Sequence, residues 1–194
     1  RLAKNKTLVQ DLYCIEMLAR VDVLCLDKTG TITDGKMKVQ EVVVLKDDLT
    51  TPINHIMGSM LACLGESNQT NIALTDYFGY SKRLKKTEVI PFSSERKYSA
   101  VSFTDGNTYV LGAPEFVMPT LPARIEQAII GFAQSGLRVL LLAQSKEPIK
   151  DGVAPKNLSP AAMIVIQDHI REDAEETIKW FMESGVEIKV ISGD

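Results

Sequence analysis

The sequence predicts an α/β fold in which an incomplete doubly wound parallel sheet is interrupted by an inserted α+β domain with an antiparallel sheet. Three observations support this class. Short apolar runs typical of buried parallel strands lie near both ends of the chain, at Val21–Leu26 and Val186–Ile191. A stretch with helical spacing, Glu172–Ser184, precedes the second run, and strands that alternate with helices form parallel sheets. Between the two ends, short strands and the glycine-containing turn Asp105–Asn107 indicate antiparallel hairpins.

The first half of the chain contains two predicted strands and two predicted helices. The run Val21–Leu26 is almost continuously apolar, so we expect a strand buried on both faces, with Cys25 as a small buried side chain. Thr51 is a typical helix cap, and Pro52 favours the first helical position of the helix that follows it. The other two elements are a strand, Val39–Leu45, and a helix, Ile72–Tyr80.

The second half begins with short strands and returns to the first pattern near its end. The expected elements are the strands Glu88–Phe92, Tyr98–Phe103 and Thr108–Leu111, the helix Arg124–Ser135, the strand Leu137–Ala143 and a loop from Lys146 to Pro160. The strand Ala161–Ile166 then precedes the helix Glu172–Ser184 and the strand Val186–Ile191. This strand–helix–strand order predicts a parallel pair of strands with a right-handed crossover.

Composition excludes several classes of protein. Of the 194 residues, 45% are hydrophobic and 24% are charged, which is ordinary for a packed globular protein. The net charge is −3, whereas nucleic-acid binders usually have a strongly basic surface, so we expect no nucleic-acid partner. No stretch reaches the roughly 20 apolar residues that a membrane span needs. Both ends are abrupt, and we expect the chain to be a piece of a longer protein.

Two acidic turns follow the terminal apolar strands. Asp27–Thr33 has the sequence Asp-Lys-Thr-Gly-Thr-Ile-Thr, and the last three residues are Ser192, Gly193 and Asp194. Ligands of open parallel sheets bind outside the carboxyl ends of the strands, and turn amides there can cradle a phosphate. Asp27 is therefore a candidate nucleophile toward phosphorus. The alternative for an isolated aspartate is a solvated acid in a strand-end turn.

The seven residues Asp27–Thr33 match the phosphorylation motif of P-type cation-transporting ATPases, which are members of the haloacid dehalogenase superfamily. Five further segments resemble that family's motifs in the expected order: Phe92–Lys97 the adenine-pocket segment, Gly112–Glu115 the Lys-Gly-Ala-Pro-Glu motif, Gly136–Arg138 an arginine-bearing strand start, Asp168–Arg171 the hinge motif, and Ser192–Asp194 the Thr-Gly-Asp motif. The resemblance extends along the whole chain.

The resemblance implies catalytic roles for Asp27, Lys28, Thr29, Ser192, Gly193 and Asp194. Asp27 would accept the γ-phosphate of ATP, and its carboxylate would hold Mg²⁺ together with the carbonyl of Thr29. Lys28 and Thr29 would form the turn. Ser192 and Gly193 would cradle the transferred phosphate, and Asp194 would lie near the metal and the nucleotide's phosphates.

The resemblance also implies nucleotide-binding roles for Asn71, Phe92, Lys97, Gly112, Ala113 and Arg138. Phe92 would stack on adenine, and Lys97 and Arg138 would approach the phosphates. Gly112 would let the nucleotide approach the backbone closely. The structural alternatives are a core aromatic residue for Phe92, a strand-end turn for Gly112 and a surface side chain for Arg138.

The chain departs from the family pattern at three places. Leu111 stands where the Lys-Gly-Ala-Pro-Glu motif has its lysine, which removes a cation from the expected pocket. Asn71 stands where an acidic residue often faces the amino group of adenine. His169 and Ile170 replace two prolines of the hinge motif, which implies a less rigid hinge.

We therefore expect a phosphorylation domain of the haloacid dehalogenase type, formed by residues 1–36 and 168–194, with a nucleotide-binding domain, residues 37–167, inserted in it. The parent would be an ATP-driven cation pump, with this part at the cytoplasmic face of the membrane. Its partners would be the nucleotide and the transmembrane and actuator domains of the same polypeptide. The expected cofactors are ATP and Mg²⁺.

Two alternatives and one limit accompany this interpretation. A soluble phosphatase of the same superfamily would normally carry aspartate as its acid and base where this chain has Thr29. A non-catalytic nucleotide-sensing module would suit Leu111 and Asn71, but does not account for the intact motif at Asp27. The family's second aspartate-rich motif and its catalytic lysine would follow Asp194, so we expect this chain alone to phosphorylate itself poorly.

Overall fold

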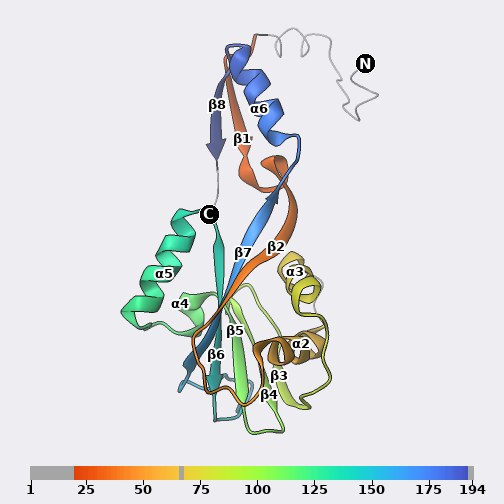
Figure 1. Ribbon diagram of the computed structural model, residues 1–194, viewed down its shortest axis with the longest axis vertical. Coiled ribbons are helices and arrows are strands. Elements are labelled where there is room, and N and C mark those ends of the chain that lie inside the picture. The colour runs from red at the N-terminus through yellow and green to blue at the C-terminus, as the bar shows by residue number, and fades with distance from the viewer. Residues whose placement is uncertain (1–19, 66–67, 192–194) are drawn as a thin grey trace. The chain divides into compact units, whose positions relative to one another are not determined.

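The computed structural model describes residues 20–65 and 68–191 (Figure 1). The chain forms two compact units, one from the segments before Lys36 and after Asp168, the other from Lys36–Asp168. Two long strands, β2 (Thr33–Val44) and β7 (Ser159–Ile170), carry the chain from one unit into the other. The expected combination of a parallel and an antiparallel sheet is confirmed.

The described residues of the first unit contain a parallel pair of strands and one α-helix. β1 (Val23–Asp27) pairs in parallel with β8 (Glu187–Ile191), so that Asp27 lies opposite Ile191. The helix α6 (Ala174–Glu183) precedes β8 and packs against it (Figure 1). This strand pair carries the Asp27 loop at its carboxyl end.

The prediction that Val21–Leu26 forms a strand buried on both faces is wrong. β1 alternates between exposed and half-buried side chains, and Cys25 is exposed rather than buried. On β8, Ile191 is 59% exposed. The reason is that one helix can cover only one face of a two-stranded sheet. Among the described residues, the apolar side chains on the other face of β1 and β8 therefore remain exposed to solvent.

The second unit contains a six-stranded sheet in the order β2-β7-β6-β5-β4-β3. Neighbouring strands run antiparallel from β3 to β7. Its remaining strands are β3 (Lys86–Ile90), β4 (Tyr98–Phe103), β5 (Thr108–Gly112) and β6 (Arg138–Ser145). The turn between β4 and β5 has Gly106 at φ 80°, a conformation that favours glycine, as the sequence predicts.

The predicted parallel pair between Ala161–Ile166 and Val186–Ile191 is also wrong. The first segment belongs to β7, which pairs antiparallel with β6, whereas β8 pairs with β1. β7 lies between β2 and β6 in the sheet and is buried on both faces from Ala161 to Ile166. A central strand covered on both faces therefore has the same apolar pattern in an antiparallel sheet as in a parallel one.

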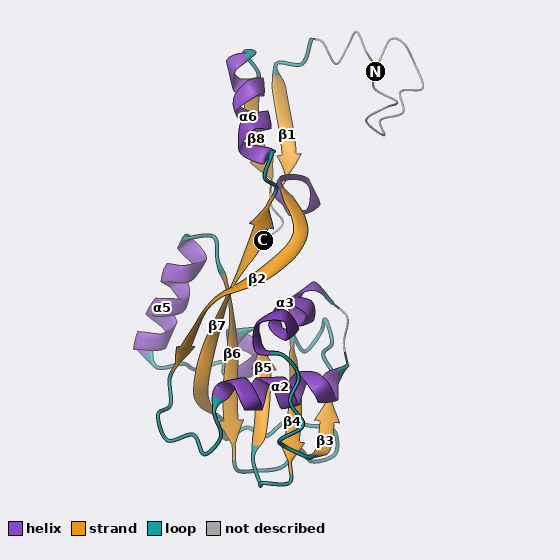
Figure 2. Cartoon of the chain, turned by 45° about the vertical axis from the view of Figure 1, so that its right-hand side comes forward, coloured by secondary structure: helices purple, strands orange, loops and turns teal. Residues whose placement is uncertain are grey.

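Helices cover both faces of the six-stranded sheet (Figure 2). On one face, α2 (Ile53–Leu64) and α3 (Gln69–Phe78) bury Met57, Met60 and Leu74 against one side of β4 and β5. On the other face, α4 (Pro114–Val117) and α5 (Ala123–Gln134) bury Val117 and Ile125 against Ala100 and Val110. α2 begins at Ile53, so Pro52 precedes the helix instead of occupying its first position.

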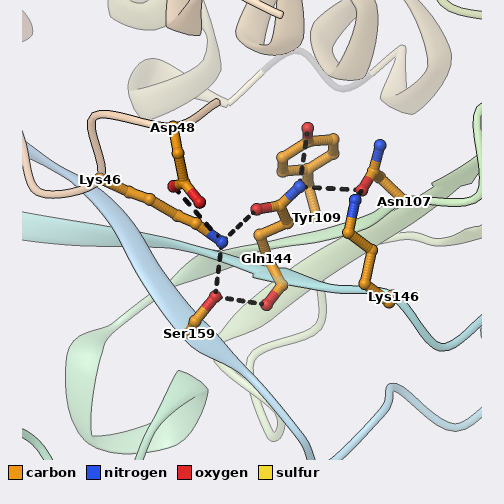
Figure 3. A network of polar contacts seen from close by, with 7 residues as sticks. All are labelled: Lys46, Asp48, Asn107, Tyr109, Gln144, Lys146 and Ser159. Atoms are coloured by element: carbon orange, nitrogen blue, oxygen red, sulfur yellow. Dashed lines mark hydrogen bonds and ion pairs between the residues drawn. The ribbon is translucent and has the colours of Figure 1, made fainter. Parts of the chain in front are cut away.

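A buried polar network links β5, β6 and β7 (Figure 3). The side-chain amide of Gln144 donates to Asn107 Oδ1 at 2.8 Å, and its Oε1 accepts from Lys46 Nζ at 2.9 Å. Lys146 Nζ also donates to Asn107 Oδ1, at 2.8 Å. Burial raises the pKa of the neighbouring Tyr109 to about 12, and the negative charge of Asp105 adds to this effect. This network gives buried polar groups their partners at one end of the sheet.

Candidate functional site

A cavity of about 340 Å³ lies in the second unit where α2 and α3 meet the sheet. The residues that line it are Leu64, Asn68, Thr70, Asn71, Leu74, Phe92, Lys97, Ser99, Leu111, Gly112, Ala113 and Leu140. It therefore brings together five of the six residues that the resemblance assigned to a nucleotide, from three separate segments of the chain. The exception is Arg138.

The cavity has an apolar wall and a few polar groups. Leu64 and Leu74 come from the two helices, and Leu111 and Leu140 from the sheet. Leu111, which replaces the family's lysine, is only 5% exposed and contributes to the hydrophobic core. The pocket wall at this position is thus packed and uncharged.

Asn71 is positioned by the start of α3. The side chain of Asn68 caps this helix, because its Oδ1 accepts a hydrogen bond from the Asn71 backbone amide at 2.9 Å. Asn71 is 7% exposed and lies in the first helical turn, so its side chain is held at the cavity by a well-defined backbone. Sequence reasoning did not identify Asn68, although an asparagine three residues before Asn71 is a typical capping signal.

Lys97 ends a tight turn on the other side of the cavity. Its backbone amide donates to Ser93 O at 2.8 Å, and its φ of 57° lies in the left-handed region, which is uncommon for a residue with a side chain. The carbonyl of Lys97 accepts from the amide of Ala113 at 3.0 Å. These bonds tie the turn to the end of β5 and place the exposed lysine beside the cavity.

Gly112 is explained by contacts within the chain. A Cβ atom built at this position would lie 2.3 Å from Lys97 O and 2.5 Å from Tyr98 Cα. Contacts this short involve backbone atoms that cannot move independently. The sequence left open a close approach by a ligand or a strand-end turn, and the structure adds a third reason, the close approach of the β4 backbone where Tyr98 pairs with Gly112.

Arg138 is not among the residues that line the cavity. It is the first residue of β6, and its Nη2 donates to Asp168 Oδ2 at 3.3 Å. Side chains two positions apart on a strand share a face, so Arg138 lies on the same face as Leu140, which does line the cavity. The arginine that the resemblance predicts to approach phosphate therefore forms an ion pair with Asp168 in this structure.

The Asp27 loop, Lys28–Ile32, follows β1 directly. Thr29 (φ −82°, ψ 120°) and Gly30 (φ 81°, ψ −9°) have the dihedral angles of a type II turn, which requires a positive φ at its second central residue. Asp27 Oδ1 accepts a hydrogen bond from the Thr29 amide at 3.2 Å. The turn therefore orients both the Asp27 carboxylate and the peptide that carries the Thr29 carbonyl.

The loop is closed by Thr33 and Arg171. Thr33, 3% exposed, accepts from the Gly30 amide at 3.2 Å and donates to Lys28 O at 3.4 Å through its hydroxyl. Arg171 Nη2 donates to Gly30 O at 3.2 Å. The predicted residues Ser192, Gly193 and Asp194 lie outside the described residues, and the last described residue, Ile191, pairs with Asp27.

The Asp27 loop offers oxygen atoms of the kind that bind hard cations. A carboxylate at Asp27 and a carbonyl at Thr29 are oxygen ligands of the kind that Mg²⁺ prefers, and Mg²⁺ usually keeps several waters besides. Among the described residues, no cluster of three or more His, Cys, Asp or Glu is placed to hold a metal ion. In the part of the chain that the structure describes, every helix is too short or too polar to span a membrane.

Comparison with known proteins agrees with the motifs. The family model described as haloacid dehalogenase-like hydrolase matches residues 21–194. The chain is 37% identical over 195 residues to the calcium-transporting ATPase CtpE of Mycobacterium bovis, and 38% identical over 197 residues to the probable cation-transporting ATPase exp7 of Streptococcus pneumoniae. CtpE of Mycolicibacterium smegmatis is 35% identical over 195 residues.

These matches use the whole of this chain but a limited part of each relative. They cover 24%, 25% and 24% of the three proteins, so the chain spans about a quarter of the length of the curated relatives it matches. The family match covers nearly all of this chain. The chain therefore belongs to the haloacid dehalogenase-like hydrolase family, and its relatives are P-type cation-transporting ATPases, as the heptapeptide beginning at Asp27 predicts.

Proposed function

We propose that this chain is the ATP-binding and phosphate-accepting part of a cation-transporting P-type ATPase. The Lys36–Asp168 unit binds the nucleotide, and the other unit accepts the γ-phosphate on Asp27. The observation that supports this most directly is the cavity, because it gathers Asn71, Phe92, Lys97, Gly112 and Ala113 at one place. They belong to three segments of the chain that are far apart in sequence, and the fold brings these segments together.

The cavity suits a nucleobase in size and chemistry. Its volume of about 340 Å³ lies at the lower end of the range of small-molecule sites, and such sites are mainly apolar with a few polar groups. Phe92 is 43% exposed, so part of its ring is available for stacking, which is worth roughly 1–3 kcal/mol per base. The base and sugar would occupy the cavity, and the phosphates would extend past the exposed Lys97.

The neutral wall at Leu111 lowers the expected affinity for ATP. The lysine of the family motif could donate a charged hydrogen bond, which is stronger than a neutral one, whereas leucine can donate no hydrogen bond at all. Asn71 can still hydrogen-bond to the base through its amide, but without a charge. We therefore propose that stacking on Phe92 and the charge of Lys97 supply most of the affinity.

In the proposed reaction, a carboxylate oxygen of Asp27 forms a bond to the γ-phosphorus as the bond to the leaving ADP oxygen breaks. The turn at Gly30 holds the carboxylate at the carboxyl end of β1, where ligands of such sheets bind. Mg²⁺, held by the Asp27 carboxylate and the Thr29 carbonyl, would neutralise charge on the phosphate when bound. Thr29 has no acid–base group, so the aspartyl-phosphate would persist long enough to drive a conformational cycle.

The domain organisation and the setting of the parent protein are part of the same proposal. Residues 1–36 and 168–194 form an incomplete phosphorylation domain, into which residues 37–167 are inserted as the nucleotide-binding domain. The remainder of the pump supplies the transmembrane and actuator domains, and this part lies at the cytoplasmic face. The aspartyl-phosphate would change the affinity and access of cation sites in the membrane domain.

The test is a calorimetric or NMR titration of this chain with ATP, with and without Mg²⁺. We expect saturable binding that Phe92→Ala weakens about tenfold, equivalent to about 1.4 kcal/mol. Phe116→Ala is the matched control, because Phe116 is 45% exposed, close to the 43% of Phe92, but does not line the cavity. Equal weakening by both variants, or no binding by a folded wild-type chain up to several millimolar, would contradict the proposal.

A further inference from the structure

Arg171 contacts the Asp27 loop through both its backbone and its side chain. Its amide donates to Ile32 O at 3.0 Å, and its guanidinium donates to Gly30 O at 3.2 Å. Gly30 lies 141 positions earlier in the sequence, so this contact exists only through the fold. Arg171 directly follows β7 and begins the short link to α6.

The guanidinium bond is made at the part of the loop where orientation matters most. Gly30 is the second central residue of the type II turn, and its carbonyl belongs to the peptide that immediately follows. The peptide on the other side of Gly30 carries the Thr29 carbonyl, and the Thr29 amide that donates to Asp27 lies one peptide further back in the same turn. A donor fixed on Gly30 O therefore restrains the geometry of the acceptor carboxylate.

The two bonds from Arg171 have separable consequences. The backbone bond to Ile32 O does not depend on the side chain, so an alanine at position 171 keeps the loop attached. Only the bond to Gly30 O is lost. Since Arg171 is exposed, its truncation leaves no cavity in the core. Loss of this side chain should therefore loosen the turn without unfolding the unit.

We propose that Arg171 is a positioning residue for phosphoryl transfer: it holds the Gly30 peptide so that Asp27 and the Thr29 carbonyl keep their productive orientation. This proposal rests on the proposed function, because it assumes that Asp27 accepts phosphate. It assigns Arg171 no contact with the substrate. A misplaced nucleophile slows the chemical step while nucleotide binding, which depends on the other unit, is retained.

The experiment uses the intact ATPase that contains this chain, with γ-labelled ATP and rapid quenching. We expect Arg171→Ala to slow formation of the aspartyl-phosphate at saturating ATP about tenfold, with less than a twofold change in the ATP concentration for half-maximal rate. Arg171→Lys can still donate one hydrogen bond, and we expect it to recover to within about threefold of wild type. Arg83→Ala removes an exposed arginine that does not line the cavity and belongs to the unit without the Asp27 loop, so it should leave the rate unchanged.

Hydrogen exchange supplies a second, independent measurement on this chain alone. Arg171→Ala should speed exchange of the amides of the Asp27 loop by at least tenfold, while exchange in β4 stays at the wild-type rate. A wild-type exchange rate in the loop of the variant would overturn the proposal. If Arg171→Ala fails to fold, Arg171→Lys replaces it in both measurements. An Arg171→Lys enzyme that phosphorylates Asp27 at the full wild-type rate, although its loop amides exchange without protection, would then overturn the proposal.

The outcomes separate this inference from the function it rests on. Wild-type enzyme that carries no label at Asp27, judged against Asp27→Asn, would overturn the proposed function. Wild-type enzyme labelled at Asp27 with an unimpaired Arg171→Ala would overturn only the role of Arg171. Equal losses in rate and ATP affinity, with no recovery in Arg171→Lys, would indicate a purely structural role and would also overturn it.

Discussion

Replacement of Gly112 by alanine tests how the cavity is built. The new Cβ would lie 2.3 Å from Lys97 O, and a further 2.5 Å contact to Tyr98 Cα also involves backbone. The strands must therefore separate by roughly 1 Å, and overpacking of this kind typically costs about 1–3 kcal/mol. Loss of the hydrogen bond from the Ala113 amide to Lys97 O adds about 0.5–1.5 kcal/mol. We expect a total loss of roughly 2–4 kcal/mol in the free energy of unfolding.

The assay is urea unfolding combined with an ATP titration of the folded variant. Gly131→Ala is the control, since Gly131 lies within α5 with no heavy atom near its added Cβ. Alanine is favoured over glycine in a helix by about 0.5–1 kcal/mol, so this control should stabilise the chain. The reasoning would be refuted by a Gly112→Ala chain as stable as wild type. Unchanged stability with weakened ATP binding would instead indicate that the glycine serves only the ligand.

Three further predictions follow from individual residues. Gly30→Ala forces a residue with a side chain to adopt φ 81°, a strain of about 1–2 kcal/mol. We expect rapid quenching of the intact ATPase to show slower phosphorylation of Asp27 at an unchanged ATP affinity. A wild-type rate would contradict the idea that the type II turn orients Asp27. Gln144→Met keeps the side-chain volume but removes the hydrogen bonds of this buried side chain to Asn107 and Lys46, so urea unfolding should show a loss of about 2–3 kcal/mol. Gln134→Met, at an exposed position, should lose less than about 0.5 kcal/mol, and equal effects of the two substitutions would refute the network's role. The pKa of Tyr109 is raised in the folded chain to about 12 from an ordinary 10, so folding favours its protonated form and stability falls as pH rises above 10. From about pH 9 to pH 11, the free energy of unfolding of wild type should fall by about 1 kcal/mol more than that of Tyr109→Phe. Parallel pH profiles of the two chains would contradict this.

Local pattern was sufficient to predict most of the elements. The strand Tyr98–Phe103 has the bounds that the sequence predicts, and α2 begins directly after Pro52. These predictions succeed because helical spacing, alternation and turn residues act within a few positions of the chain. The direction in which a buried strand pairs does not depend on local pattern, so the apolar run Ala161–Ile166 does not show by itself that this strand pairs antiparallel with β6.

The candidate site was predictable only where a residue has a recognisable chemistry. Phe92 and Lys97 follow from an adenine-pocket motif, and both line the cavity. Leu74 and Leu140 line it as well, but their spacing is that of ordinary core residues, and no sequence signal separates them from the rest of the core. Arg138 has the expected motif, yet its ion pair with Asp168 depends on β6 and β7 being neighbours.

By itself, the sequence determined the family, the heptapeptide motif that begins at Asp27 and the order of helices and strands, because each depends on residues that are close together in the chain. The tertiary structure decided which strands pair, why position 112 must be glycine and that Arg171 holds the loop after Asp27. Each of these depends on contacts between distant segments, whose free energy comes from burial and hydrogen bonding that no single segment contains.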